Sequence, residues 1–253
     1  MQFGACTSSS RALAAQAGGW DFLEENVQGY LKGQTDDWQA PASPALPVPS
    51  ANSLVPGTLP IVGPNVDFAA LSQYMNRVIT RAQQVQMHTL VFGSGGARNV
   101  PEGFDRNKAV DQITNFLHMV APVAQHHGVT IVIEPLNRGE CNIINSVAEA
   151  MTYVTRVNHP AVKCLVDSYH MWLEDEPLSN LEAAMPSIAH VHVADKDGRV
   201  CPGESGTSDY VSFFKVLKQG GYDKLVAVEA RGFDLQTTGP RCLHFLQDAW
   251  AKA

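Results

Sequence analysis

Residues 129–142, VTIVIEPLNRGECN, decide the fold that we predict for this chain. The apolar run that starts at Val129 is typical of a buried β-strand, and it leads directly into the carboxylate of Glu134. Pro135 ends the strand, because proline has no N–H to donate to a sheet. A carboxylate buried at a strand end must lose its charge or lie beside a cation. Glu134 is therefore either a metal ligand or base, or the partner of a neighbouring Lys or Arg.

The same pattern returns three times towards the C-terminus. The apolar runs KCLVD, IAHVH and VAVE end at Asp167, His192 and Glu229. In a barrel of parallel strands these ends meet at one mouth, so the four side chains should lie close together. Three carboxylates without a cation would repel one another, which favours a bound divalent ion. Three carboxylates and one imidazole suit a hard-to-borderline ion such as Mn²⁺, Mg²⁺ or Co²⁺.

Strands and helices alternate along the chain, which predicts parallel strands joined by crossover helices. We expect strands at residues 1–6, 21–26, 48–54, 89–92, 129–134, 162–166, 188–194 and 225–228. We expect helices at residues 8–18, 180–184 and 209–219, after caps at Asp67 and Ser146, and from near Asn107 and Pro240. Eight such units in 253 residues predict one (β/α)8 TIM barrel domain over residues 1–253. The runner-up, an open doubly wound sheet, needs a Gly-rich first turn, which GACTSSS at residues 4–10 does not provide.

Two segments between strands carry unusual residues. Residues 41–64 contain seven prolines, which exclude a helix, and we predict an ordered active-site loop there. Residues 93–98, GSGGAR, suggest a phosphate cradle but lack the dinucleotide-binding spacing, and no helix is expected to follow at once. Arg98 could hold a phosphate or carboxylate, or form a salt bridge within the loop. Pro122 is expected to kink or end its helix.

Further ionisable residues lie near the predicted strand ends. His170 follows Asp167 by three residues and is expected on a loop over the mouth, either bound to substrate hydroxyls or in solvent. His190 shares a face with His192 but lies deeper, so we predict a supporting or core role. The adjacent acids Glu24 and Glu25 end the second predicted strand and could also line the mouth, but no role is assigned to them.

Composition excludes several classes of function. The formal net charge is −7 and no Lys/Arg cluster exceeds a pair, so we expect no binding to nucleic acid or to an anionic membrane. No apolar run approaches the ~20 residues that a membrane helix requires. The N-terminal segment lacks the pattern of a secretory signal. The five cysteines are scattered without CxxC spacing, which favours reduced thiols in the cytoplasm.

The segments EPLNRGECN, DSYHM, HVHVADKDGRVCPGE and VEAR resemble the xylose-isomerase-like barrel superfamily. They are most similar to its sugar-phosphate isomerase/epimerase branch, which includes ketose 3-epimerases and hydroxypyruvate isomerase. The similarity is close over residues 134–231 and extends to the first half only in outline. It implies a TIM barrel enzyme that acts on a small sugar or keto-sugar with one divalent ion, most often Mn²⁺. It does not identify the sugar, and a homo-oligomer stays open.

The resemblance also implies residue roles. In ketose 3-epimerases the four strand-end positions bind the metal ion, and the two glutamates form the acid/base pair; here these are Glu134, Asp167, His192 and Glu229. By motif position, Glu140, His170 and Arg199 resemble residues that contact the substrate. This chain has one residue more than the family between His192 and the Arg. It also lacks counterparts of the aromatic residues that shape the sugar pocket from the first two loops.

This chemistry would proceed by removal of a proton next to a carbonyl, through a metal-stabilised enediolate. Return of the proton to the opposite face gives epimerisation, and return to the adjacent carbon gives aldose–ketose isomerisation. The alternatives are a metal-dependent lyase resembling the barrel subunit of C-glycoside deglycosidases, an endonuclease-IV-like phosphodiesterase, and a non-catalytic sugar-binding barrel. The phosphodiesterase would need a three-zinc cluster with more histidines and a basic groove.

Overall fold

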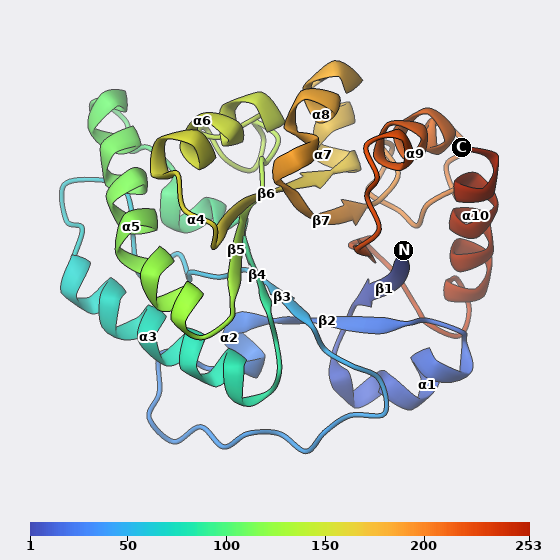
Figure 1. Cartoon of the computed structure of the whole chain (residues 1–253), viewed down its shortest axis with the longest axis horizontal. Helices are drawn as coiled ribbons and strands as arrows, with labels where there is room; N and C mark the ends of the chain where they lie inside the picture. The colour runs from blue at the N-terminus through green and yellow to red at the C-terminus, as the bar shows by residue number, and fades with distance from the viewer.

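Eight parallel strands pair in chain order and close on themselves in the computed structural model, which describes residues 1–253 (Figure 1). The strands are β1 (Gln2–Cys6), β2 (Phe22–Asn26), β3 (Ser50–Asn52), β4 (Thr89–Phe92), β5 (Thr130–Ile133), β6 (Val162–Asp167), β7 (Ile188–Val193) and β8 (Leu225–Val228). Because β1 pairs with both β2 and β8, the sheet has no free edge. The predicted (β/α)8 barrel is confirmed, with the strands at the expected places.

Helices surround the barrel (Figure 1). They are α1 (Ala12–Ala17), α2 (Val27–Tyr30), α3 (Phe68–Gln84), α4 (Gly95–Arg98), α5 (Arg106–His126), α6 (Val147–Val157), α7 (Ser168–Leu173), α8 (Leu178–Ala184), α9 (Tyr210–Gln219) and α10 (Gly239–Lys252). Two predicted caps are confirmed, because the side chains of Asp67 and Ser146 accept N–H groups of the first turns of α3 and α6. Asp209 caps α9 in the same way. None of the helices has the length and apolar character that crossing a lipid bilayer requires.

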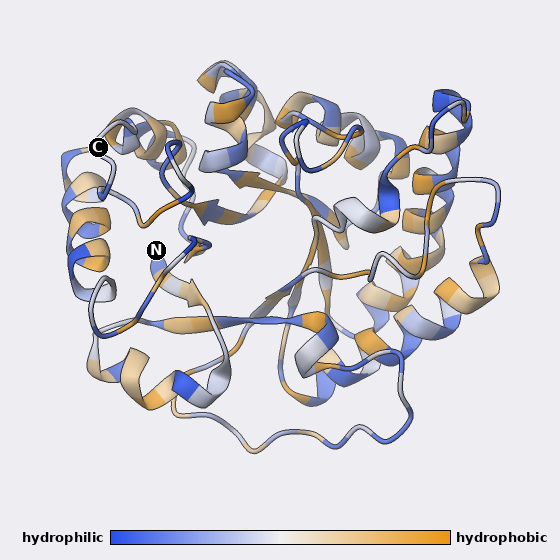
Figure 2. Cartoon of the chain, turned by 180° about the vertical axis from the view of Figure 1, so that it is seen from behind, coloured by the Kyte–Doolittle hydropathy of each residue, from blue (hydrophilic) through white to orange (hydrophobic).

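The main core lies between the strands and the helices that cover them. Figure 2 shows apolar residues on the strands and on one side of most of the surrounding helices. The buried face of α3 shows the spacing expected of this packing, because Leu71, Met75, Val78 and Ala82 are all buried. A separate small cluster of Phe22, Leu225 and Ala227 is contributed by β2 and β8. Burial of apolar surface on these faces therefore fixes the helices around the barrel.

Residues 41–64 contain the predicted short strand, but only part of this segment forms the predicted active-site loop. The part before β3 runs outside the barrel as an extended trace, and residues 41–45 line a hollow there with residues 8–10 of the loop after β1 (Figure 1). Only the part after β3 reaches the mouth, where Ser53, Val55 and Gly57 line a cavity. β3 itself has three residues, and the carbonyl groups of the preceding Pro47 and Pro49 still accept N–H groups from neighbouring segments. Proline therefore shortens this strand without leaving its neighbours unpaired.

One other local prediction is wrong, and another is wrong in part. The one-turn helix α4 begins inside the Gly-rich loop at Gly95, where no helix was expected. Pro122 lies inside α5, which continues to His126, so the proline does not end the helix; the alternative, a kink, stays a prediction. A long, well-packed apolar face stabilises α5 more than the lost hydrogen bond at one proline destabilises it. Eight buried residues of α5 form that face.

The absence of a side chain at Gly4 makes room for Phe22. A Cβ at Gly4 would lie 2.4 Å from the Phe22 ring, which is 1% exposed. We therefore expect Gly4→Val to lower the free energy of unfolding by about 1–3 kcal/mol, because an overpacked core forces its neighbours out of their best positions. Urea denaturation would measure the change. Gly29→Ala is the control, since its Cβ would come no closer than 4.0 Å to another residue; equal midpoints for both variants would contradict the prediction.

Candidate active site at the barrel mouth

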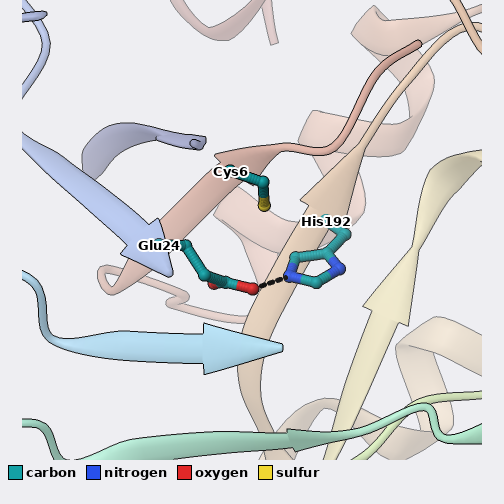
Figure 3. A group of neighbouring side chains, drawn as sticks. All are labelled: Cys6, Glu24 and His192. Atoms are coloured by element: carbon teal, nitrogen blue, oxygen red, sulfur yellow. Dashed lines mark hydrogen bonds and ion pairs between the residues drawn. The ribbon is translucent and has the colours of Figure 1, made fainter. Parts of the chain in front are cut away.

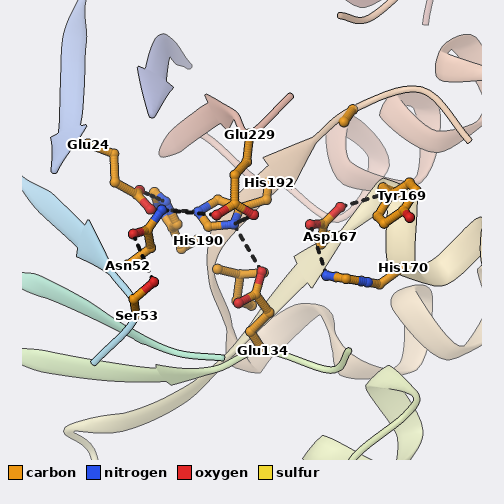
Figure 4. A network of polar contacts seen from close by, with 12 residues as sticks. Glu24, Asn52, Ser53, Glu134, Asp167, Tyr169, His170, His190, His192 and Glu229 are labelled. Carbon is orange, nitrogen blue, oxygen red and sulfur yellow. Dashed lines mark hydrogen bonds and ion pairs between the residues drawn. The ribbon is translucent and has the colours of Figure 1, made fainter. Parts of the chain in front are cut away.

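Four side chains from consecutive strands converge at the mouth of the barrel (Figure 4). Glu134 follows β5, Asp167 ends β6, His192 lies near the end of β7, and Glu229 follows β8. One ligand atom of each lies within 4.8 Å of those of the other three. The structure therefore brings together the four residues predicted as metal ligands. Their spacing is the consequence of a closed barrel, in which parallel strands end at one rim.

His192 is at the centre of this group and is fully buried. Its Nδ1 lies 3.0 Å from Oε1 of Glu134 and 3.4 Å from Oε2 of Glu229. Burial alone would lower the pKa of His192, but the surrounding carboxylates, above all Glu24, raise it well above its usual range. The protonated imidazole thus supplies part of the positive charge that the neighbouring carboxylates require.

Asp167 has one carboxylate oxygen in use and one free. Its Oδ1 accepts the N–H of Tyr169 at 2.8 Å and so caps α7. Its Oδ2 is buried without a hydrogen-bond partner. The nearest side-chain nitrogens are Nε2 of His170 at 3.7 Å and Nη2 of Arg199 at 3.8 Å. A buried carboxylate oxygen without a donor is costly. This free oxygen, together with the three-oxygen, one-nitrogen donor set, fits a hard-to-borderline divalent cation.

The two glutamates have different surroundings. Glu229 accepts Nδ2 of Asn52 at 2.9 Å on one oxygen and Nη2 of Arg199 at 2.6 Å on the other. Burial would raise the pKa of Glu229, but His192 and then Arg199 outweigh it and hold the pKa at about 2. Burial also raises the pKa of Glu134, and there the hydrogen bond from His192 only partly offsets it.

Backbone features hold Glu134 in place. A Cβ at Gly93, just after β4, would lie 2.2 Å from Oε2 of Glu134, so only glycine leaves room for this carboxylate. Arg98 is fully buried and donates to the carbonyl groups of Phe92 and Glu134, both at 2.7 Å. Both sequence-based alternatives for Arg98 are therefore wrong, because its guanidinium joins the ends of β4 and β5 instead of holding an anion.

The three predicted substrate contacts surround the same site. Arg199 lies 4.8 Å from the Tyr169 ring and 3.2 Å from Oε1 of Glu140, in addition to its contact with Glu229. His170 is on α7 and 2% exposed, not on an open loop. Its Nδ1 accepts the backbone N–H of Asn137 at 3.1 Å, so Nε2 carries the proton and faces Asp167.

A cavity of about 340 Å³ opens above these residues. Its walls are the loop after β3, the Gly-rich loop after β4, and the acidic residues of the mouth; only Val55 and Leu136 are large apolar residues. A polar wall of this kind suits a ligand with many hydroxyl groups. The hollow of about 690 Å³ outside the barrel is larger, but none of the four converging residues lines it.

Sequence reasoning missed several contributors to the site. Glu24 of β2 contacts both His190 and His192 (Figure 4), and Asn52 ends β3 beside Glu229. The available signal was position, because Asn52 is a polar residue at the end of β3 and Glu24 is a polar residue within the otherwise apolar start of β2. That signal was weak, since β3 is short and Glu24 has an equally acidic neighbour.

Comparison with known proteins agrees with the fold. The family model "Xylose isomerase-like TIM barrel" matches residues 49–244. A 3-dehydro-D-guloside 4-epimerase of Escherichia coli is 32% identical over 132 residues, which are 52% of this chain and 49% of that protein. A D-psicose 3-epimerase of Agrobacterium fabrum is 27% identical over 143 residues, 54% of this chain and 48% of that protein. The chain thus matches about half the length of these curated relatives.

A solved structure extends the similarity to the whole fold. The D-psicose 3-epimerase of Clostridium cellulolyticum superposes with a TM-score of 0.87 over 99% of both chains, at 18% sequence identity. At this identity the likeness establishes the architecture and leaves the chemistry to the site residues.

Gly93 provides a test of the Glu134 position. We expect Gly93→Ala to weaken Mn²⁺ binding at least about tenfold, because the added methyl group would displace the whole Glu134 carboxylate, one of the predicted ligands, and metal sites depend on such positioning. Isothermal titration calorimetry would measure the affinity. Gly96→Ala, in the same loop, is the control, since its Cβ would meet nothing closer than 3.4 Å. Unchanged Mn²⁺ affinity in Gly93→Ala would show that Glu134 does not need this position.

Proposed function

The chain belongs to the xylose isomerase-like TIM barrel family, and on that premise we propose that it is a divalent-metal-dependent epimerase or isomerase of sugars. The observation that carries the proposal is the convergence of three carboxylates and one imidazole at the mouth, with Oδ2 of Asp167 buried and unpaired. The relatives named above are epimerases of D-psicose and of a 3-dehydro-D-guloside, which supports sugar chemistry of this type.

Glu134, Asp167, His192 and Glu229 would hold one divalent ion, for which Mn²⁺ is the first candidate and Mg²⁺ and Co²⁺ the alternatives. The ion would supply positive charge to the substrate oxygens as negative charge develops on them. The side chains of the protein would bind the sugar and transfer the proton.

Glu134 and Glu229 are the proposed acid/base pair. They approach from the ends of β5 and β8 and flank Nδ1 of His192 (Figure 4). Oε2 of Glu134 faces Gly93 and has no hydrogen-bond donor, so it is free to exchange a proton with the substrate. One glutamate takes the proton from the carbon next to the carbonyl, which leaves an enediolate, and the other returns a proton to the opposite face. Return to the neighbouring carbon would instead give aldose–ketose isomerisation.

We propose an unphosphorylated sugar or keto-sugar as the substrate. Arg98 is bound to backbone carbonyl groups, and Arg199 already contacts Glu229 and Glu140, so neither guanidinium is free to bind a phosphate. Glu140 and Arg199 line the cavity and would contact sugar hydroxyl groups. His170 would donate from Nε2, which has no partner in the protein.

No observation favours the alternatives. The lyase would use the same proton abstraction and would differ in its substrate and in a required partner chain. A phosphodiesterase with three zinc ions would need more imidazole ligands, whereas the four-residue group contains one histidine.

Isotope exchange tests the reaction directly. We expect Mn²⁺-dependent incorporation of deuterium from D₂O at one carbon of a free ketose or keto-sugar, with no incorporation into the corresponding phosphates. Glu134→Gln and Glu229→Gln should each lose exchange by at least about 100-fold, the usual contribution of general acid–base catalysis. Mass spectrometry and NMR would locate the label. Lack of exchange in Mn²⁺-loaded wild-type protein, across the panel, would overturn the epimerase/isomerase proposal.

Metal binding should also stabilise the fold. At a Mn²⁺ concentration about 100 times the dissociation constant, binding adds about 2.7 kcal/mol to the free energy of unfolding. We expect differential scanning fluorimetry to show a higher melting temperature with Mn²⁺ for the wild type and little change for Asp167→Asn. A melting temperature that does not respond to Mn²⁺, Mg²⁺ or Co²⁺ would contradict a metal site at the mouth.

A further inference from the structure

Glu24 of β2 lies beneath the mouth and is 1% exposed. Its Oε2 accepts Nε2 of His190 at 2.6 Å and the hydroxyl of Ser50 at 2.7 Å, and its Oε1 lies 2.8 Å from Nε2 of His192 (Figures 3 and 4). Both oxygens of this carboxylate are therefore occupied by donors from β3 and β7. No residue role in the reaction proposed above uses Glu24.

Strand geometry accounts for this contact. Side chains alternate along a strand, so Glu24 points into the barrel, whereas Glu25 caps the N–H of Ser9 outside it. His190 and His192 share one face of β7 for the same reason, and both are fully buried. A buried carboxylate is stable only when it is paired and hydrogen-bonded, and the two imidazoles meet that requirement.

The contact determines which nitrogen of His192 is protonated. An ionised carboxylate can only accept a hydrogen bond, so Nε2 of His192 must carry a proton. Nδ1 lies 3.0 Å from Oε1 of Glu134 and 3.4 Å from Oε2 of Glu229, among the other proposed ligands, so a bound ion would displace the proton of Nδ1 while Nε2 keeps the proton that Glu24 holds. A carboxylate that receives the second N–H of a ligand histidine fixes both the ring orientation and the tautomer.

We propose that Glu24 is a positioning residue that holds the Nε2–H of His192, so that His192 binds the divalent ion through Nδ1. The inference rests on the proposed function, since it assumes an ion among the four strand-end residues. Glu24 acts through His192 and does not itself touch the substrate. It also adds negative charge behind the ligand, which makes the imidazole a better donor to the ion.

The same contacts argue against a second metal site nearby. Cys6 of β1 lies close to Glu24 and His192 (Figure 3), with one ligand atom of each residue within 4.8 Å of the others. Both oxygens of Glu24 are already hydrogen-bonded, and Nε2 of His192 holds a proton instead of a free lone pair. Burial further raises the pKa of the Cys6 thiol, which disfavours the thiolate.

The variant Glu24→Gln separates this role from simple burial. A glutamine presents one acceptor oxygen and one amide donor to two histidine nitrogens that both donate in the wild type. One imidazole must therefore give up its Nε2 proton, and in His192 that change would place the proton on Nδ1 and block the ion. If His190 gives up its proton instead, His192 still loses the negative charge behind it and is a poorer donor to the ion. We expect the Mn²⁺ affinity to fall about 10- to 100-fold, the usual effect of losing such a partner. Glu25→Gln removes the same charge on the other face of β2 and is the matched control, with wild-type affinity expected.

A second measurement needs no variant. Long-range ¹H–¹⁵N NMR spectra of the Mg²⁺-loaded wild-type protein should show a protonated Nε2 and an unprotonated Nδ1 for His192. The opposite tautomer would overturn the proposal, even if Glu24→Gln failed to fold. Equal Mn²⁺ affinity in Glu24→Gln, Glu25→Gln and the wild type would overturn it while leaving the proposed function intact. If the wild type binds neither Mn²⁺ nor Mg²⁺, the metal-dependent function and this inference fail together.

Discussion

The confinement of several carboxylates at one end of a closed barrel is the constraint on which the rest of the site depends. Eight parallel strands must end at the same rim, and four of them deliver an acid or a histidine to a space in which ligand atoms lie within 4.8 Å of one another. Like charges at this distance raise each other's pKa unless positive charge is supplied. Arg199 supplies part of it, and so does His192 while both of its nitrogens are protonated; a divalent ion bound through Nδ1 would replace the charge of that imidazolium.

Hydrogen bonds from the surrounding structure hold most of these charged side chains in fixed positions. Asn52 and Arg199 fix both oxygens of Glu229, Glu24 fixes the ring of His192, and the cap of α7 fixes one oxygen of Asp167. Glu134 is held through its backbone by Arg98, while its free oxygen faces the cavity. A site held by rigid strand ends and buried hydrogen bonds is already organised before a substrate binds, and such preorganisation favours catalysis.

The two halves of the barrel contribute differently. The strands β5–β8 carry the four converging residues, whereas the loops after β3 and β4 supply the polar wall of the cavity. The first half is also less regular, because α2 has four residues, β3 has three, and a proline-rich segment replaces a covering helix between them. This division places the chemistry on regular elements and the selection of substrate on loops that can vary without disturbing the ligands.

The amino-acid sequence by itself determined the barrel and the four strand-end residues. Periodicity, capping residues and the position of an acid at a strand end are local features, and the closed parallel barrel converts them directly into a shared mouth. Only the tertiary structure decided the roles of Glu24, Asn52 and Arg98. Glu24 meets His190 across 166 residues of sequence, and Asn52 meets Glu229 across 177. These hydrogen-bond partners depend on how strands that are distant in the sequence come together in the barrel. The sequence alone is therefore consistent with several different side-chain pairings.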